Sequence, residues 1–298
     1  MACQSGSEQR AAEAQKFLRE IRVLVDEKLD AHLPPVSERP SRIHEAMRYS
    51  VFAGGKRLRP GLCYAAWKAF GGKGEEIFYA TSALEMFHTF SLIHDDLPCV
   101  DDDDLRRGRP TAHRQYDEAT AVMAGDALCV HAFALLAKTG APEVVATMAD
   151  ALGTGGMIGG EITDIESEGK KVDLATVDYI HDCKTARLIE ASLVVGAQIA
   201  GAPKPDVEAL ARFGRKIGLA FQVVDDVLDV VSTTEQLGKD AGSDVEQGKA
   251  TYPALVGVEA SRKRARELVD QALVDLEQVH ADTTVLRNIA DFIVQRVN

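Results

Sequence analysis

The sequence has little of what marks several large protein classes. Its five cysteines are Cys3, Cys63, Cys99, Cys129 and Cys183. They form no CxxC pair and show no zinc-ligand spacing, which indicates reduced thiols in a cytoplasmic setting. Basic residues number 34 against 46 acidic ones, a formal charge of −12, so we expect no nucleic-acid partner. No apolar run approaches the ~20 residues that a membrane span needs, and no secretory signal opens the chain.

Signals for β-structure are also missing, because the chain has no alternating apolar–polar run and no Asn-Gly or Asp-Gly turn. Residues 11–33 instead repeat apolar side chains near a period of 3.6, which is typical of a helix. Further helices are expected at 42–55, 60–72, 75–97, 117–140, 141–156, 176–201, 206–232, 252–279 and 284–298. With no Pro-, Gly- or Ser-rich linker, we predict one all-α domain over 1–298, with residues 1–10 as a flexible N-terminus.

Carboxylates are concentrated in the stretch SLIHDDLPCVDDDDLRRGRP, residues 91–110. Asp95 and Asp101 are six positions apart and would not share a face of a regular helix. Pro98 breaks the helix between them, so the chain can turn Asp101 back toward Asp95. Taken alone, a run of aspartates is more typical of a solvated loop.

A second acidic motif, FQVVDDVLD, lies on an otherwise apolar helix. Asp225 and Asp229 are four apart and share a helix face, which Gln222 joins. Since unpaired charges are costly to bury, they should face a polar cavity. Mg²⁺ takes one or two protein carboxylates and completes its shell with water and phosphate oxygens. Two carboxylate walls therefore predict a phosphate ligand bridged by Mg²⁺.

Basic residues accompany the acidic motifs. The segment GGKRLRP places Lys56, Arg57 and Arg59 after a glycine pair, and Arg106 and Arg107 follow the first aspartates. Arginine binds phosphate through two parallel hydrogen bonds, and lysine acts as a point charge. Each residue alone is more often a surface charge, but beside an acidic site we interpret the set as diphosphate binders.

The motifs HDDLPCVDDDDLRRGRPTAH, FQVVDDVLD and GGKRLRP together resemble those of short-chain trans-polyprenyl diphosphate synthases, most of all the bacterial-type farnesyl diphosphate synthases. GGEITD, IHDCKTARLI, LGKDAGSDVEQGKATYPAL and DFIVQRVN are similar too, so the resemblance runs from about residue 44 to the end. It implies long helices around a deep central cavity, a homodimer, and condensation of isopentenyl diphosphate with an allylic diphosphate.

The resemblance also implies roles for single residues. Three Mg²⁺ ions would be held by Asp95, Asp96, Asp101, Asp225, Asp226 and Asp229. The allylic diphosphate would be bound by Arg106, Lys184 and Lys239, and isopentenyl diphosphate by Lys56, Arg59, His88 and Arg107. The catalytic set would be Asp95, Asp225, Lys184, Thr185 and Gln222, the last two near the developing cation. No protein nucleophile is required, and no GxSxG motif is present.

Product length depends in this family on bulky residues just before the first acidic motif. Phe90 lies five residues before Asp95, about 7.5 Å along a helix, and Ser91 next to it is small. We therefore favour farnesyl diphosphate, made through dimethylallyl and geranyl transfer, over geranylgeranyl diphosphate.

Two departures from the family pattern are Glu161 in place of the glutamine of GGQ and Ala186 in place of the glycine of KTG. Three other readings stay open: a non-catalytic subunit of a prenyl synthase heteromer, a class I terpene cyclase, and a structural acidic bundle. Loss of a motif would favour the first, and a single aspartate-rich motif the second.

Overall fold

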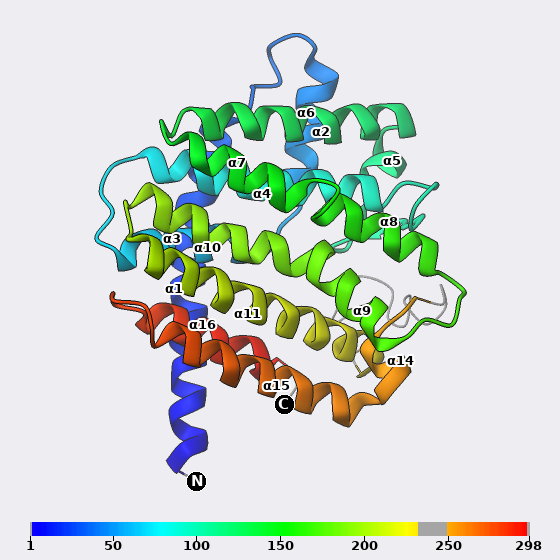
Figure 1. Ribbon diagram of the computed structural model, residues 1–298. Coiled ribbons are helices and arrows are strands. Elements are labelled where there is room, and N and C mark those ends of the chain that lie inside the picture. The colour runs from blue at the N-terminus through cyan, green and yellow to red at the C-terminus, as the bar shows by residue number, and fades with distance from the viewer. Residues whose placement is uncertain (1, 232–248, 297–298) are drawn as a thin grey trace.

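Most residues of the computed structural model, which describes residues 2–231 and 249–296, lie in helices (Figure 1). In chain order they are α1 (Ala2–His32), α2 (Ser41–Val51), α3 (Leu58–Ala69), α4 (Glu76–Asp95), α5 (Ala112–Gln115), α6 (Glu118–Ala137), α7 (Pro142–Leu152), α8 (Met157–Ser167), α9 (Leu174–Ile180), the π-helix η1 (His181–Ala186), α10 (Arg187–Ile199), α11 (Lys204–Val231), α14 (Tyr252–Val256), α15 (Val258–Leu276) and α16 (Thr284–Gln295). The strands of the described residues, β1 (Leu105–Arg106) and β2 (Arg109–Pro110), form one short ribbon. The predicted all-α fold is confirmed.

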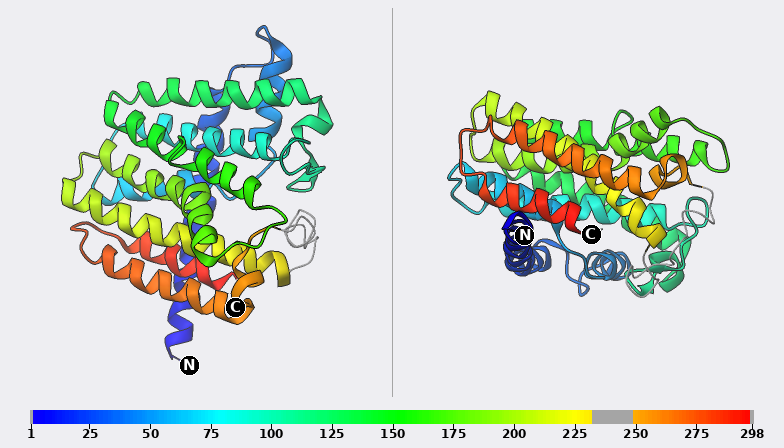
Figure 2. Two further views of the ribbon diagram at one scale, coloured as in Figure 1. Left: turned by 45° about the vertical axis from the view of Figure 1, so that its right-hand side comes forward. Right: turned by 90° about the horizontal axis from the view of Figure 1, so that it is seen from below.

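The helices are stacked in layers. α6 packs on α4, α4 on α3, α3 on α10, α10 on α11 and α11 on α15, while α1 runs steeply across the stack (Figures 1 and 2). α10 is buried along most of its length, from Leu188 to Ala197, which places it at the centre of the stack. Its Leu188 and Val195 belong to a core shared with α4 and α6, whereas its Ile189 and Leu193 belong to a core shared with α11 and α15.

Some helix boundaries differ from the predicted ones. The segment 252–279 is not one helix, because Gly257 takes a φ of 82° and divides α14 from α15. Only glycine adopts that backbone without steric cost. α8 was not predicted as a helix, since two glycines, Gly159 and Gly160, weaken its helical pattern.

The N-terminal segment belongs to α1, which begins at Ala2 and so includes most of the stretch expected to be flexible. Ser7 accepts a hydrogen bond from Gln295 of α16 (2.6 Å), and Arg10 pairs with Asp291. α1 and α16 therefore pack together near both ends of the described chain.

Among the described residues, α6 is a helix long and apolar enough to cross a membrane by length and composition alone. The apolar-run test on the sequence missed it, because polar residues such as Asp126 and His131 interrupt the run. A core helix passes the same test, and α6 packs against α4, α2 and α5. This finding is therefore weak evidence for a membrane span.

Candidate active site

A cavity of about 580 Å³ opens among α4, α8, η1 and α11. Most of the predicted site residues line it: Arg59, His88, Phe90, Ser91, Asp95, Asp101, Arg106, Arg107, Lys184, Thr185, Gln222, Asp225 and Asp226. Helices distant in sequence thus bring both acidic motifs and the basic residues to one place.

The first acidic wall forms where α4 ends. The helix stops at Asp95, and the backbone N–H of Asp101 donates to the Asp95 carbonyl (2.9 Å). The turn predicted from Pro98 is therefore present, and it brings both carboxylates to the cavity. Burial raises the pKa of Asp95 to about 8; Lys184 opposes the rise, and nearby carboxylates such as Glu161 add to it.

Asp96 does not line this cavity. It is buried, and its carboxylate accepts a hydrogen bond from Nε of Arg106 (2.9 Å). Nη2 of Arg106 donates to Asp103 (2.7 Å). Burial raises the pKa of Asp96 to about 6, against the opposing charge of Arg106. Asp96 thus contacts Arg106, which lines the cavity, and does not line the cavity itself.

The β1–β2 ribbon directs the two arginines that follow the aspartates. Its register pairs Arg106 with Arg109, and Arg107 and Gly108 form the turn with φ values of 55° and 74°. Positive φ at both central positions is the signature of a type I′ hairpin turn. A positive φ is unfavourable for arginine and is found preferentially at functional sites.

The second acidic wall is the C-terminal part of α11. Asp226 accepts hydrogen bonds from Gln222 Nε2 (3.1 Å) and from the backbone N–H of Tyr252 (3.0 Å), and His181 Nε2 lies 3.2 Å away. Asp225 faces the cavity beside it. Asp229 lies one turn further along the same face of α11, as its spacing predicted, but it is buried and does not line the cavity.

The π-helix η1 presents Lys184 and Thr185 between the two walls. π-turns are rare and occur frequently at functional sites. Thr185 Oγ1 donates to Gln222 Oε1 (2.7 Å), while Lys184 Nζ lies 2.7 Å from both Glu161 Oε2 and Asp164 Oδ2 of α8. Burial lowers the pKa of Lys184, but the surrounding carboxylates outweigh burial, and the pKa is raised well above its usual value.

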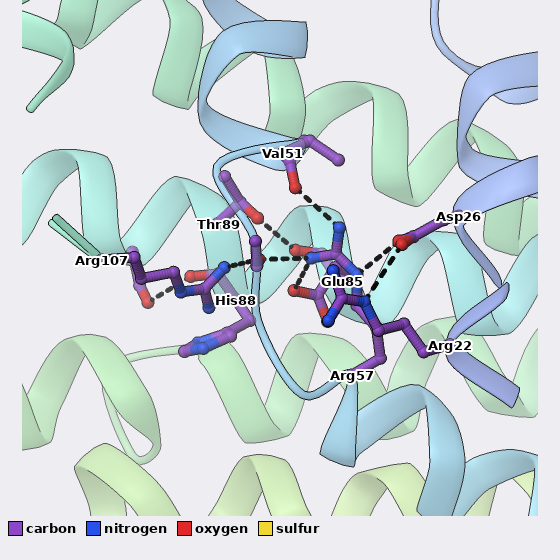
Figure 3. A network of polar contacts seen from close by, with 10 residues as sticks. Arg22, Asp26, Val51, Arg57, Glu85, His88, Thr89 and Arg107 are labelled. Atoms are coloured by element: carbon purple, nitrogen blue, oxygen red, sulfur yellow. Dashed lines mark hydrogen bonds and ion pairs between the residues drawn. The ribbon is translucent and has the colours of Figure 1, made fainter. Parts of the chain in front are cut away.

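The loop before α3 distributes its basic residues in three directions. Arg59 lines the cavity, and its Nε is buried with no hydrogen-bond partner among the described residues. Lys56 is exposed and lies outside the cavity lining. Arg57 is buried and pairs with Asp26 and Glu85 (Figure 3), so it is not the diphosphate binder that the sequence suggested. Lys239 lies outside the described residues.

Six polar residues of the cavity lining were not singled out from the sequence: His94, Asp164, His181, Lys249, Thr251 and Arg296. Lys249 Nζ lies 3.0 Å from Asp101 Oδ2, and Arg296 Nη1 lies 2.8 Å from Asp225 Oδ1. Lys249 lies in the motif DVEQGKATYPAL and Arg296 in the motif DFIVQRVN. The resemblance therefore included both residues, but the sequence did not indicate their contacts with the aspartates. Arg296, which directly follows α16, thus reaches the second acidic wall.

The cavity lining includes an aromatic residue of α4, Phe90. Phe90 is 7% exposed, and its ring meets that of Phe87 edge to face, with centroids 6.5 Å apart. Phe87 in turn packs on Phe133 of α6 at 4.7 Å. Phe90 is thus a cavity residue supported from behind by two further rings.

The donor chemistry of the walls fits Mg²⁺ bound together with a phosphate. Within the described residues, no three His, Cys, Asp or Glu side chains converge closely enough to enclose a metal by themselves. Mg²⁺ does not require such a cage, since it usually keeps several waters and shares one or two carboxylates with substrate phosphates. Asp95, Asp101 and Asp225 would supply those carboxylates.

Comparison with known proteins identifies the family. Residues 40–289 match the family model described as polyprenyl synthetase. The chain belongs to this family. It is 45% identical over 291 residues to a chloroplastic geranylgeranyl pyrophosphate synthase of Capsicum annuum, which covers 95% of this chain and 78% of that protein. It is 44% identical over 280 residues to farnesyl diphosphate synthase of Escherichia coli, covering 90% and 94% of the two chains.

A solved structure extends the similarity to the fold. The geranyltransferase from Helicobacter pylori, complexed with magnesium and isoprenyl diphosphate, superposes with a TM-score of 0.82 at 33% identity, over 93% of this chain and 95% of that one. The protein is thus a trans-prenyltransferase of isoprenoid biosynthesis. Substrates in this family are isopentenyl diphosphate and allylic diphosphates.

Proposed function

We propose that the protein is a farnesyl diphosphate synthase. It would condense isopentenyl diphosphate with dimethylallyl diphosphate and then with geranyl diphosphate, and stop at fifteen carbons. The observation that carries the proposal is Phe90, a cavity residue one helical turn and a half before Asp95 and backed by Phe87. A lengthening chain that begins at the acidic wall would meet this ring.

The residues of the cavity suit each step of the reaction. Arg106 and Lys184 would hold the allylic diphosphate, and Arg59, Arg107 and His88 the isopentenyl diphosphate. Bound Mg²⁺ would neutralise charge on the leaving diphosphate and so favour ionisation of the allylic C–O bond. The resulting carbocation would lie beside the Thr185–Gln222 pair, whose oxygens carry the partial negative charge that stabilises a cation.

The isopentenyl double bond would then attack the cation, forming one carbon–carbon bond. Loss of a proton from the adjacent carbon, to the departed diphosphate, completes the product. The apolar side chains that line the cavity, among them Phe90, Ile162 and Phe221, would exclude water from the cation. No covalent bond to the protein forms at any step.

Geranylgeranyl diphosphate is the second candidate product. A similar protein carries that name, and Ser91, which also lines the cavity, is a small residue. In that case the chain would pass Phe90 and end deeper between α4 and α6.

A product assay distinguishes the candidates. Purified protein is incubated with Mg²⁺, isopentenyl diphosphate and dimethylallyl diphosphate, and product length is read by mass spectrometry, with EDTA added in a parallel sample. We expect a C15 product in the presence of Mg²⁺ and none with EDTA. A C20 end product would refute the farnesyl assignment but keep the reaction class. No condensation from any allylic starter would favour a non-catalytic subunit.

Substitution of Phe90 tests the chain-length role directly. In Phe90→Ala we expect C20 or longer products to replace C15, because the ring no longer ends the cavity. Phe78→Ala is the matched control: Phe78 lies on the same helix, outside the cavity lining, with Lys28 over its ring. Its product should remain C15, and an equal shift in both variants would contradict the role of Phe90.

A further inference from the structure

Arg57 does not line the cavity that Arg59 lines. Figure 3 shows its guanidinium group among Asp26, Val51 and Glu85. Arg57 is 3% exposed, and its φ of 50° lies in the left-handed region at the N-cap of α3. Such a backbone is unfavourable for arginine and persists only where its surroundings impose it. The contacts of the Arg57 side chain must therefore stabilise the turn that leads into α3.

All three nitrogens of the Arg57 guanidinium donate, each to a different element. Nε donates to Asp26 of α1 (2.7 Å), and Nη2 donates to the carbonyl of Val51, the last residue of α2 (2.8 Å). Nη1 donates to Glu85 of α4 (2.6 Å) and to the carbonyl of Gly54 (3.2 Å). One buried side chain thus connects three helices to the loop before α3.

The Gly54 carbonyl joins this buried group to the cavity wall. It accepts hydrogen bonds from Nη1 of Arg57 and from Nη1 of Arg107, so it lies between the two guanidinium groups. The loop is packed tightly there, because a Cβ on Gly55 would come within 2.6 Å of Arg107 Nη1. A shift of Arg57 would therefore displace Arg107.

Glu85 supplies the negative charge among these arginines. It is 2% exposed and lies three residues before His88, on an adjacent position of the same helix. Burial lowers the pKa of Arg59 and of Arg107, and the Glu85 carboxylate opposes this shift. At Arg57 burial acts in the same direction, but Glu85 and Asp26 outweigh it and the pKa is raised. Without Glu85, three crowded guanidinium groups would repel one another before any anionic substrate arrives.

We propose that Arg57 and Glu85 are positioning residues for the isopentenyl diphosphate half of the site. The pair fixes the Gly54 carbonyl and through it Arg107, and it holds the turn of α4 that carries His88. Lys184, assigned to the allylic diphosphate, is bound instead to Glu161 and to a second carboxylate of α8. The pair therefore acts on one substrate. This inference rests on the proposed function.

The experiment measures the two substrates separately. The Kd of isopentenyl diphosphate is measured by calorimetry without an allylic partner, and KM for it and for geranyl diphosphate from initial rates. In Arg57→Lys the ammonium cannot reach Asp26, Glu85 and Val51 together. We expect Kd and KM for isopentenyl diphosphate to rise about ten- to hundredfold, because small misplacements of binding groups have effects of this size. KM for geranyl diphosphate should change less than about twofold.

A second variant tests whether misfolding explains the effect of Arg57→Lys. Arg57→Met combined with Glu85→Met removes both charges, and apolar replacement of a buried ion pair is often tolerated. The double variant should show the same rise in Kd and KM for isopentenyl diphosphate, with KM for geranyl diphosphate nearly unchanged. The control Asp275→Asn breaks ion pairs to Arg212 (3.1 Å) and Lys216 (2.5 Å) between α11 and α15, outside the cavity, and should change neither constant.

An equal rise in KM for both substrates, or no change in either KM, would overturn the positioning role. A wild-type protein that binds isopentenyl diphosphate but forms no product would instead overturn the proposed function, and the Kd comparison would still test the positioning role.

Discussion

Arg57 and Arg59 are two residues apart, yet one neutralises buried carboxylates and the other lines the cavity. The local sequence does not distinguish the two arginines, since both are cations that follow a glycine pair. What separates them is the left-handed turn at Arg57 and the presence of Glu85, a residue of another helix. At this scale, residue type predicted the chemistry, and long-range contacts decided which arginine performs it.

Glu161 is one of the two residues in which this chain departs from the motifs it resembles, and the structure gives the departure a consequence. Its carboxylate lies 2.7 Å from Lys184 Nζ, so it would compete with an allylic diphosphate bound by that ammonium. In Glu161→Gln, Lys184 loses this ion pair and keeps the one with Asp164. We expect KM for geranyl diphosphate to fall about three- to tenfold, as charge-assisted contacts are the stronger ones, with KM for isopentenyl diphosphate unchanged in initial-rate assays.

The same substitution at Glu166, an exposed residue of α8, is the control and should leave both constants unchanged. A rise in KM for geranyl diphosphate in Glu161→Gln would contradict competition and would instead indicate that this carboxylate assists binding.

His88 makes stability depend on pH in a defined direction. Burial, and then the charges of Arg59 and Arg107, lower its pKa well below the usual 6.5. The unfolded chain takes up this proton near pH 6.5 and the folded chain does not, so stability is lost as pH falls. Between pH 7.5 and 5.5 we expect the wild type to lose about 1.4 kcal/mol more than His88→Gln.

Urea unfolding of both proteins at the two pH values measures this difference. Between pH 7.5 and 8.5, where neither state of His88 titrates, the two proteins should change in parallel. Equal losses down to pH 5.5 would show that His88 is protonated in the folded protein.

At the scale of elements, the sequence predicted the end of the helix before Pro98 but not the π-helix within the predicted helix 176–201. Pro98 has a fixed effect on the backbone, so the return of Asp101 to Asp95 followed from the sequence. The π-helix that presents Lys184 and Thr185 has no such local marker, and the sequence predicted a continuous helix there. Packing of η1 between α8 and α11 accompanies the wider turn.

The contact between α3 and α10 depends on a glycine. A Cβ on Gly196 would lie 2.1 Å from the carbonyl oxygen of Cys63, and backbone atoms cannot move aside as a flexible side chain can. We expect Gly196→Ala to destabilise the protein by about 1–3 kcal/mol, the usual range for overpacking. Chemical denaturation measures the loss. Gly155→Ala, where a Cβ would meet nothing within 4 Å, should cost much less; comparable losses would contradict the close-approach explanation.

At the scale of the whole molecule, the outer face of α6 is unusually apolar. Met123 and Val130, seven residues apart on one face, are 54% and 70% exposed. We propose that this face meets a second copy of the chain, which would make the homodimer implied by the family resemblance.

Sedimentation of the wild type should then give twice the 32.2 kDa of the chain. Val130→Glu places a charge in the apolar interface and should give the monomer mass. Val23→Glu is the control, since Val23 is similarly exposed (68%) but lies on α1. A monomeric wild type, or dissociation by both substitutions, would contradict the assignment of this face.

The sequence by itself determined the helical class, the two acidic motifs and the basic residues beside them, because helical periodicity, proline breaks and charge spacing act over a few residues. Only the tertiary structure decided that Asp96 sits behind Arg106, that Asp229 lies outside the cavity, and that Lys249 and Arg296 meet the aspartates. Those outcomes depend on how helices far apart in the chain pack, and packing is set by the shapes of many side chains at once, which local spacing does not encode.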